Sequence, residues 1–239
     1  MMVNNCLGTP NIILNCLSEE IARKVEPHVE RIGLSRKQAL SACDEEVTAI
    51  HFPEGGVVSC VVGNGGDDTE AALIGYEGFT GVCALLGDRI SMEDTFVQVD
   101  GSTALAIPVN VLLDLMAEHA AARSMILLYA RYRLLQSNFA ILSCSRHVME
   151  ARLARWLLMC HDRLDGDTIE LTHEFMAMMI SAQRSGVTLA LHSLEGSGMI
   201  RSSRGKVVIV DRDKLRELAG SSYGAPERRY SELIAPFGK

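Results

Sequence analysis

The hydrophobic pattern of this chain changes its period at Pro108, and this change limits the possible folds more than any other feature. From 45 to 107, five short apolar or alternating runs read EVTAIHF, VVSCVVG, TEAALIG, TFVQVDG and TALAIP, separated by the turn signals PEGG, GNGGDD and DG. Such runs are typical of strands in a sandwich or barrel. After Pro108 the turn residues disappear, and helical spacing continues to about Ser143. The pattern predicts an α+β protein in which a β-domain precedes a long helix.

The long helical stretch carries two apolar stripes. The first has a 3-4-3-4-3 spacing and contains Met125, Leu128, Tyr132, Leu135, Phe139 and Leu142. The second has steps of seven and contains Leu127, Leu134 and Ile141. Because one stripe is enough to cover the β-domain, two stripes indicate two partners, the second being the same helix of another copy. We expect the first set to form this dimer contact, while a helix buried in a single core stays open as the alternative.

Helical spacing also occurs before and after these regions. From 11 to 35 the residues Ile13, Leu17, Ile21 and Val25 recur at steps of four, which predicts a small N-terminal helical piece. The run SRHVMEARLARWLLMCHDRL, from 145 to 164, predicts another amphipathic helix that opens a C-terminal domain. Its expected apolar face contains Val148, Leu153, Trp156, Leu157 and Cys160.

The charge of the chain is unevenly distributed. The net charge is -7, yet residues 41 to 100 hold twelve Asp or Glu and one basic residue, whereas 181 to 216 hold seven Lys or Arg and three acids. A charge acts within a Debye length of roughly 8 to 10 Å, so a local basic patch matters more than the total. The distribution predicts a phosphate-contacting surface in the segment 181 to 216.

This basic segment has the pattern of two short helices followed by a hairpin. Thr172 is a predicted N-cap for the first helix, whose inward side is Met176, Ala177, Met179 and Ile180. The second helix, from Gln183 to Leu194, places Val187, Ala190, Leu191 and Leu194 on one face, and Arg184, Ser185, Thr188, Leu189 and His192 on the other. Such a pair, with arginine in the first turn of the second helix, is typical of a helix-turn-helix, because arginine can donate two hydrogen bonds to guanine.

The sequence GSGMIRSSRGKVVIV follows directly and predicts a wing. Gly196 and Gly198 end the helix, IRSS and KVVIV are the expected strands, and RG forms the turn. Basic side chains on such a hairpin would lie along a DNA backbone. The candidate DNA-binding residues are Gln183, Arg184, Ser185, Thr188, Arg201, Ser203, Arg204 and Lys206.

The run from ARLARWLLMCHDRL through KVVIVDRDKL resembles the C-terminal winged helix of the Crp/Fnr family of bacterial transcription regulators. The upstream order, short strands, IGYEGFTGV and a long helix, is similar to the cyclic-nucleotide-binding-like β-roll and dimerisation helix of that family. The resemblance implies a jelly-roll type β-roll over 1–108, a dimerisation helix over 109–144, a winged helix-turn-helix over 145–220 and a tail over 221–239. It also implies a non-enzymatic, homodimeric regulator of a palindromic double-stranded DNA operator.

The resemblance places Gln183, Arg184 and Ser185 at the base-reading start of the recognition helix. Two positions depart from the family pattern. The usual turn glycine is Ser181 here, so a residue with a Cβ has to adopt a left-handed conformation, at a cost of about 1 kcal/mol. A later position that is arginine in the cyclic-AMP receptor protein is Leu189 here, so the operator sequence should differ.

The effector half of the family pattern is degenerate. Gly75, Glu77 and Gly78 resemble the first part of the cyclic-nucleotide phosphate cassette, but the second part reads SMEDTFVQV, with two acids where a cation is needed. These acids are Glu93 and Asp94, and Arg89 is the only basic residue nearby in sequence. We therefore expect no binding of cyclic AMP. An unidentified small-molecule effector and RNA polymerase stay open as partners.

No cofactor, metal or enzymatic site is expected. Seven cysteines lack any C-x-x-C spacing, Cys6 and Cys16 stand ten residues apart with no third nearby, and a lone histidine is weak evidence for haem. GNGGDD lacks the lysine of a phosphate loop, and LSCSRH is not a nucleophile elbow. Without a signal peptide or an apolar run of about 18 residues, a cytoplasmic protein without a membrane partner is expected.

One alternative from a different functional class stays open. The chain could be an effector-binding or protein-interaction module whose winged helix no longer reads DNA. Arg184 together with the three basic wing residues favours the DNA-binding interpretation.

Overall fold

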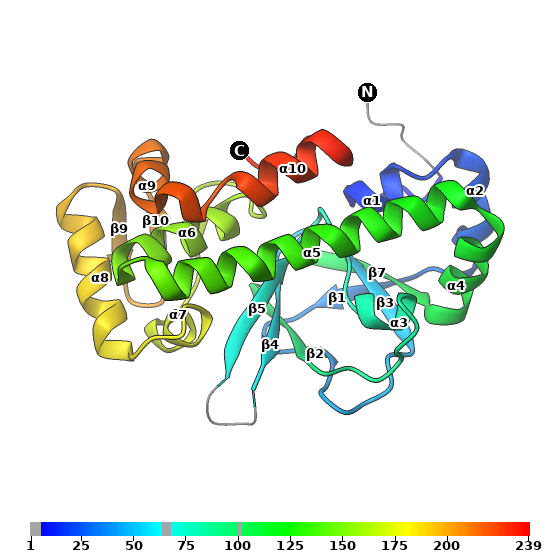
Figure 1. Cartoon of the computed structure of the whole chain (residues 1–239), viewed down its shortest axis with the longest axis horizontal. Helices are drawn as coiled ribbons and strands as arrows, with labels where there is room; N and C mark the ends of the chain where they lie inside the picture. Colours follow the sequence, from blue (N-terminus) through cyan, green and yellow to red (C-terminus); the bar gives the residue numbers. More distant parts are fainter. Residues whose placement is uncertain (1–5, 64–67, 100–101) are drawn as a thin grey trace.

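The computed structural model describes residues 6–63, 68–99 and 102–239, and arranges them along one long helix. In Figure 1 this helix, α5 (Ala120–Arg146), runs along most of the length of the molecule, with the β-strands below it and a small helical domain at one end. The predicted turns at 64–67 and 100–101 lie outside the described residues. The arrangement has the predicted α+β class.

The β-domain consists of two antiparallel sheets of three and four strands. The first, in the order β1-β7-β3, contains β1 (Glu30–Leu34), β3 (Ala49–Pro53) and β7 (Ser102–Pro108). The second, in the order β2-β6-β4-β5, contains β2 (Ala39–Ser41), β4 (Val57–Val62), β5 (Thr69–Ile74) and β6 (Asp94–Val99). The five predicted strands are confirmed as β3 to β7. The sequence pattern missed β1 and β2, which are short and mostly exposed or half-buried.

The prediction of helical structure from 11 to 35 is only partly right. The segment forms α1 (Ile12–Asn15) and α2 (Glu19–Val25), and its end forms strand β1. Ser18 starts α2 because its side chain accepts a hydrogen bond from the Ile21 N–H, and Pro27 lies in the 3-10 turn η1 (Glu26–His28) that follows. All four residues of the predicted stripe are nevertheless buried: Ile13, Leu17, Ile21 and Val25.

The predicted helix after Pro108 is two helices. α4 (Val109–Glu118) ends at His119, whose φ of -121° and ψ of 102° are extended, and α5 begins at the next residue. A further short helix, α3 (Val82–Leu85), lies within the β-domain. Tyr132, one of the expected dimer residues, is only 2% exposed and lies in the core of its own chain, so its assignment to a free surface is wrong.

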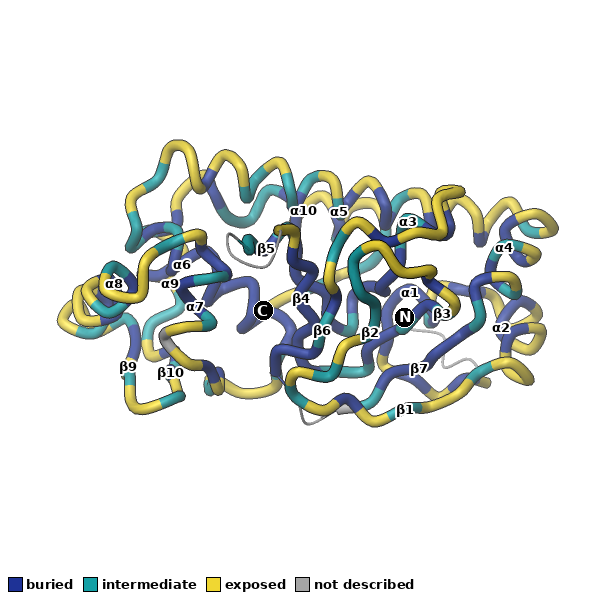
Figure 2. Tube along the Cα trace, turned by 90° about the horizontal axis from the view of Figure 1, so that it is seen from below, coloured by how far each residue is buried: buried dark blue, intermediate teal, exposed yellow. Residues whose placement is uncertain are grey.

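The most exposed apolar side chains of α5 belong to the other stripe. Leu127, Leu134 and Ile141 are 47%, 66% and 67% exposed. The remaining members of the expected dimer set, Met125, Leu128, Leu135, Phe139 and Leu142, are half-buried or exposed. Figure 2 shows the exposed side of α5 as a row of yellow turns along one edge of the molecule. The sequence distinguished two stripes, but the structure places the free one at the steps of seven.

The C-terminal domain is a small helical bundle with a three-stranded sheet, in the order β8-β10-β9. Its elements are α6 (Met149–His161), β8 (Thr168–Ile169), α7 (His173–Met179), α8 (Arg184–Gly196), β9 (Ile200–Ser203), β10 (Lys206–Ile209) and α9 (Arg212–Ala219). Leu153, Trp156, Leu157 and Cys160 are buried as expected. Val148 is 67% exposed, because it is the N-cap of α6 and not part of its buried face, which corrects the prediction.

The two domains share a buried junction. One hydrophobic cluster joins Val57 and Leu73 of the β-domain to the core of the C-terminal domain. Arg163, just after α6, forms an ion pair with Glu77 at 2.6 Å, and both side chains are fully buried. The loss of solvation is offset here by further hydrogen bonds, because Arg163 also donates to the Met159 carbonyl at 2.6 Å and to the Tyr132 hydroxyl at 3.2 Å.

The segment predicted as a tail is packed against both domains. After the short turn η2 (Gly220–Ser222) it forms α10 (Ala225–Leu233), which lies beside α5 in Figure 1. The Tyr230 hydroxyl donates to the Glu77 carbonyl at 2.6 Å, and the Arg163 guanidinium lies 5.1 Å from the centre of the Phe237 ring. Among the described residues we find no helix with the length and apolarity that a bilayer crossing requires.

Candidate nucleic-acid interface

The turn between α7 and α8 is held by local hydrogen bonds. Thr172 is the N-cap of α7, as predicted, and its hydroxyl accepts from the Phe175 N–H at 3.3 Å. Ser181 has a φ of 48°, so the expected left-handed residue with a Cβ is confirmed. Arg152 of α6 donates to the Ile180 carbonyl and, at 3.0 Å, to the Ser181 carbonyl, and the Ser181 hydroxyl lies 2.8 Å from that of Thr69 in the β-domain.

Helix α8 has one buried and one free face, as its sequence predicts. The buried residues are Val187, Ala190, Leu191 and Leu194. Gln183 is the N-cap, and it is exposed together with Arg184, Ser185, Leu189 and His192. Arg184 lies 3.4 Å from the Glu174 carboxylate of α7, with side chains 68% and 77% exposed. An ion pair so open to water contributes little to the stability of the fold, so Arg184 can leave Glu174 for another partner at little cost.

The wing is the hairpin of β9 and β10. Ser203 pairs with Lys206, and the turn between them uses Gly205, whose φ of 73° favours glycine. The Ser202 N–H donates to the Glu195 carboxylate at 2.9 Å, which fastens the wing to α8. Arg201, Ser203, Arg204 and Lys206 are all exposed.

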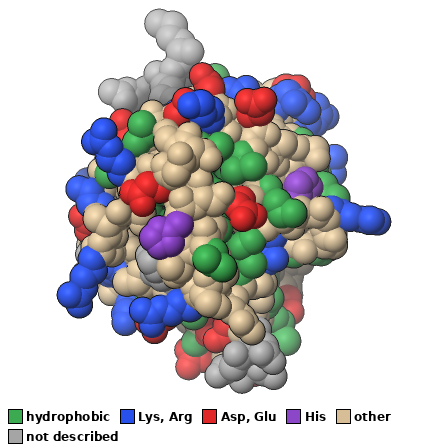
Figure 3. Space-filling model, turned by 90° about the vertical axis from the view of Figure 1, so that its left-hand side faces the viewer, with side chains coloured by type: hydrophobic (Ala, Val, Ile, Leu, Met, Phe, Trp, Pro, Cys, Tyr) green, Lys and Arg blue, Asp and Glu red, His purple; other side chains and the backbone are tan. Residues whose placement is uncertain are grey.

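A groove of about 750 Å³ lies between α8 and the wing. It brings together four of the eight predicted site residues, Arg184, Thr188, Ser203 and Arg204. Gln183 and Ser185 flank it at the start of α8, while Arg201 and Lys206 lie on the wing outside its lining. Figure 3 views this end of the molecule, where Lys and Arg side chains lie mostly towards the rim, and apolar and uncharged groups, Asp or Glu side chains and histidine lie nearer the centre.

The region with this geometry matches a known family profile. Residues 151–218 match the Crp-like helix-turn-helix domain. This segment is a Crp-like helix-turn-helix domain. In it, α7 and α8 are the helix pair and β9 and β10 are the wing. A search of curated proteins found no significant match to the chain.

Solved structures resemble the whole chain in fold. A regulator of the Crp/Fnr family from Eubacterium rectale is 17% identical with a TM-score of 0.67, over 87% of this chain and 97% of that one. FixK2 from Bradyrhizobium japonicum is 15% identical with a TM-score of 0.69, over 81% and 98%. A Crp-family regulator from Thermus thermophilus is 19% identical with a TM-score of 0.67, over 82% and 99%. The chain therefore has the fold of these regulators, with the Crp-like domain at its C-terminal side.

The segment that resembles a phosphate cassette is tightly packed. Glu77 is held by Arg163, as described above. A Cβ on Gly75 would lie 2.7 Å from the Arg163 side chain, and one on Gly78 would lie 2.0 Å from the Tyr129 hydroxyl. These glycines permit the close approach of buried side chains from α5 and from the segment just after α6.

The second cassette-like segment has a cation that the sequence pattern did not indicate. Arg133 of α5 is 11% exposed and lies 3.3 Å from the Glu93 carboxylate. Arg89, the only basic residue nearby in sequence, instead pairs with Glu46 and is 44% exposed. Arg133 was missed because it is forty positions away in sequence. It lines a groove of about 310 Å³ between α5 and the β-domain.

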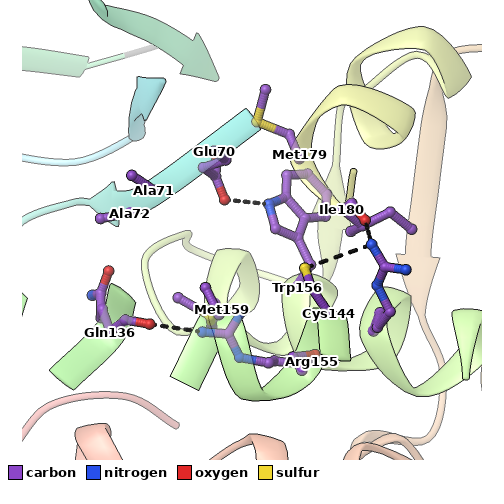
Figure 4. Close-up of a pocket in the computed structure, with 13 residues that line it drawn as sticks. Glu70, Ala71, Ala72, Gln136, Cys144, Arg155, Trp156, Met159, Met179 and Ile180 are labelled. Atoms are coloured by element: carbon purple, nitrogen blue, oxygen red, sulfur yellow. Dashed lines mark hydrogen bonds between the residues drawn. The ribbon is translucent and has the colours of Figure 1, made fainter. Parts of the chain in front are cut away.

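Burial raises the pKa of two side chains in the β-domain, Cys60 and Glu70. Arg133 donates to the Cys60 sulfur at 3.2 Å, yet burial raises the pKa of that thiol to about 12, so it stays protonated. In Figure 4, Glu70 of β5 points at the indole of Trp156 in the Crp-like domain, which donates to it at 2.9 Å. Burial raises the pKa of Glu70 to about 8.

Proposed function

We propose that this protein is a homodimeric, sequence-specific DNA-binding transcription regulator of the Crp/Fnr type. The observation that carries the proposal is the groove between α8 and the wing, where Arg184, Thr188, Ser203 and Arg204 meet within a Crp-like helix-turn-helix domain. Basic and hydroxyl side chains around one concave surface are suited to a nucleic-acid backbone and to base edges. The bulk of the chain is acidic, so DNA contact is confined to this end.

The start of α8 and the wing have different roles in this proposal. Gln183, Arg184 and Ser185 open α8, so they reach base edges when the start of the helix enters the major groove. Arg184 donates two hydrogen bonds to a guanine, and Glu174 releases it at little cost. Arg201, Ser203, Arg204 and Lys206 contact phosphates from the wing and set the register.

A dimer is the second part of the proposal. Leu127, Leu134 and Ile141 recur every seven residues on the free side of α5, and a contact between two such helices would bury them. Two copies related by a two-fold axis present two recognition helices, so the operator is a palindrome with half-sites roughly one helical turn, about 34 Å, apart. We propose that this stripe forms the dimer contact, in place of the stripe that contains Tyr132.

The effector half does not bind cyclic AMP in this proposal. Arg133 is the partly buried cation beside the second cassette-like segment, and Glu93 already neutralises it. Glu77 is likewise committed to Arg163. A phosphate would have to displace a carboxylate from a buried or partly buried ion pair, which is costly. Saturable heat on calorimetric titration with cyclic AMP would contradict this part. RNA polymerase and a small molecule other than cyclic AMP remain candidate partners. The cytoplasm remains the expected location.

The test begins with selection of bound fragments from random DNA by the purified protein, which should enrich a palindrome. On that site, Arg184→Ala should cost about 1 to 3 kcal/mol and relax the base preference at one position per half-site. Arg204→Ala should weaken specific and scrambled duplexes alike, and lower the salt slope by about one unit per phosphate contact.

Arg229→Ala is the matched control, because Arg229 is 48% exposed on α10, outside the basic segment 181 to 216, and does not line the groove. It should leave the base preference and the salt slope close to those of the wild type. If Arg184→Ala and Arg204→Ala lost affinity in parallel with specificity unchanged, α8 would not be the reader. If no sequence were enriched, the protein-interaction alternative would be favoured.

A further inference from the structure

Leu189 is an apolar side chain on the free face of α8. At 70% it is the most exposed of the large apolar side chains that the structure describes. It lies one turn after Ser185 and one turn before His192, so these three residues form a continuous ridge along the helix. The ridge faces away from the buried side of α8.

Leu189 has no part in the packing of the Crp-like domain. The buried side of α8 is complete without it, because Val187, Ala190, Leu191 and Leu194 are each at most 2% exposed. Leucine also offers no better helix propensity than alanine at an exposed position. A single exposed leucine is common on protein surfaces and would say little by itself. The position of Leu189 makes it informative, because the ridge begins beside Arg184, at the N-terminal end of α8. This is the end that we propose to enter the major groove.

Few hydrogen-bonding groups are available to a base beside Leu189. The Thr188 hydroxyl donates to the Arg184 carbonyl of its own helix at 3.0 Å, so its proton is already used there. The leucine side chain has neither donor nor acceptor. In the major groove the apolar group presented by a base edge is the 5-methyl of thymine.

Resting on the proposed function, we infer that Leu189 is a specificity-determining residue that selects thymine through contact with its 5-methyl group. The contact transfers a methyl group and an exposed leucine out of water together, so it adds affinity without a hydrogen bond. It distinguishes thymine from cytosine, which has only a hydrogen at C5, where thymine has its methyl group.

Deoxyuridine tests this directly, because it pairs like thymine and lacks only the methyl group. On the enriched palindrome, each thymine of the half-site is replaced by deoxyuridine in turn, symmetrically in both halves, and the dissociation constant is measured. For the wild type, deoxyuridine at one of these positions should weaken binding by roughly fourfold per half-site, the value expected for one buried methyl group. For Leu189→Ala this difference should disappear, while the other positions respond as in the wild type.

Leu233→Ala is the control, because Leu233 is an exposed leucine on α10, outside the Crp-like domain. It should keep the full sensitivity to deoxyuridine. Alanine suits an exposed helical position, so Leu189→Ala should fold with an unchanged circular dichroism spectrum. Specific binding in which no deoxyuridine effect depends on Leu189 would overturn the inference and leave DNA binding intact. Failure to enrich any sequence would overturn the proposed function itself.

Discussion

At the scale of single residues, Ser181 shows how a local cost is tolerated. Its φ of 48° is unfavourable for a residue with a Cβ, but the turn between α7 and α8 requires it. The hydroxyl of Ser181 lies 2.8 Å from that of Thr69, so serine adds a contact to the β-domain that glycine could not make. Serine at this position therefore has a strained backbone but adds a hydrogen bond between the two domains.

The two effects can be separated with two variants. Ser181→Ala keeps the Cβ and loses the Thr69 contact, so it should be slightly destabilised. Ser181→Gly also loses the contact but relieves the strain, and should be more stable than Ser181→Ala by roughly 0.5 to 1 kcal/mol, net of its greater chain entropy when unfolded. Urea denaturation of both variants measures this difference. A glycine variant no more stable than the alanine variant would mean that the turn carries no strain.

At the scale of elements, α5 has a different partner on each side. One side carries Ile126, Tyr129 and Tyr132, which are buried against the chain's own domains. The other exposes Leu127, Leu134 and Ile141 at steps of seven. A 27-residue helix with such a free stripe is suited to pair with a second copy of itself.

Leu134→Glu tests the proposed pairing. A carboxylate placed in the centre of the contact would be desolvated without a partner, so the dimer should lose on the order of 2 kcal/mol or more. Sedimentation at micromolar concentration should give a dimer for the wild type and monomers for Leu134→Glu. Leu189→Glu makes the same change at an equally exposed leucine on α8 and should remain dimeric. A monomeric wild type would contradict the proposal.

At the scale of the whole molecule, buried polar groups join the Crp-like domain to the β-domain. Glu70 of β5 accepts hydrogen bonds from Trp156 of α6 and from Ser59 of β4, both at 2.9 Å. Burial raises its pKa from 4.5 to about 8, despite the opposing influence of Arg155 and Arg163. The packed junction therefore favours a protonated Glu70 at neutral pH.

This raised pKa links stability to pH. Because the folded protein holds the Glu70 proton more tightly than the unfolded chain, the stabilisation is complete below about pH 4.5 and is lost as the pH rises through about 8. Between pH 6 and pH 8.5 the wild type should lose roughly 2 kcal/mol of unfolding free energy more than Glu70→Gln, which cannot ionise. Urea denaturation at both pH values measures this. Glu174→Gln, at an exposed carboxylate, should follow the wild type, and superimposed profiles for all three would refute the link.

Local sequence patterns were sufficient for most elements. The five strands β3 to β7, the capped helix α7, the buried face of α8 and the wing follow from alternation, helical spacing and glycine turns, which act between near neighbours. β1 and β2 were missed because short, largely exposed strands lack an apolar alternation. The eight candidate DNA-binding residues were identified from charge and helix position, and their role in binding remains a prediction.

Only the tertiary structure decided how the elements meet. The sequence by itself determined that α5 has two apolar stripes, but not which one its own chain covers, because both are similarly hydrophobic. The positions of the β-domain and α10 decided that Tyr132 is buried and Leu134 is free. The ion pair of Arg163 with Glu77 was equally invisible in the sequence. Such contacts join residues far apart in the chain, and their energies depend on burial that exists only after the domains pack.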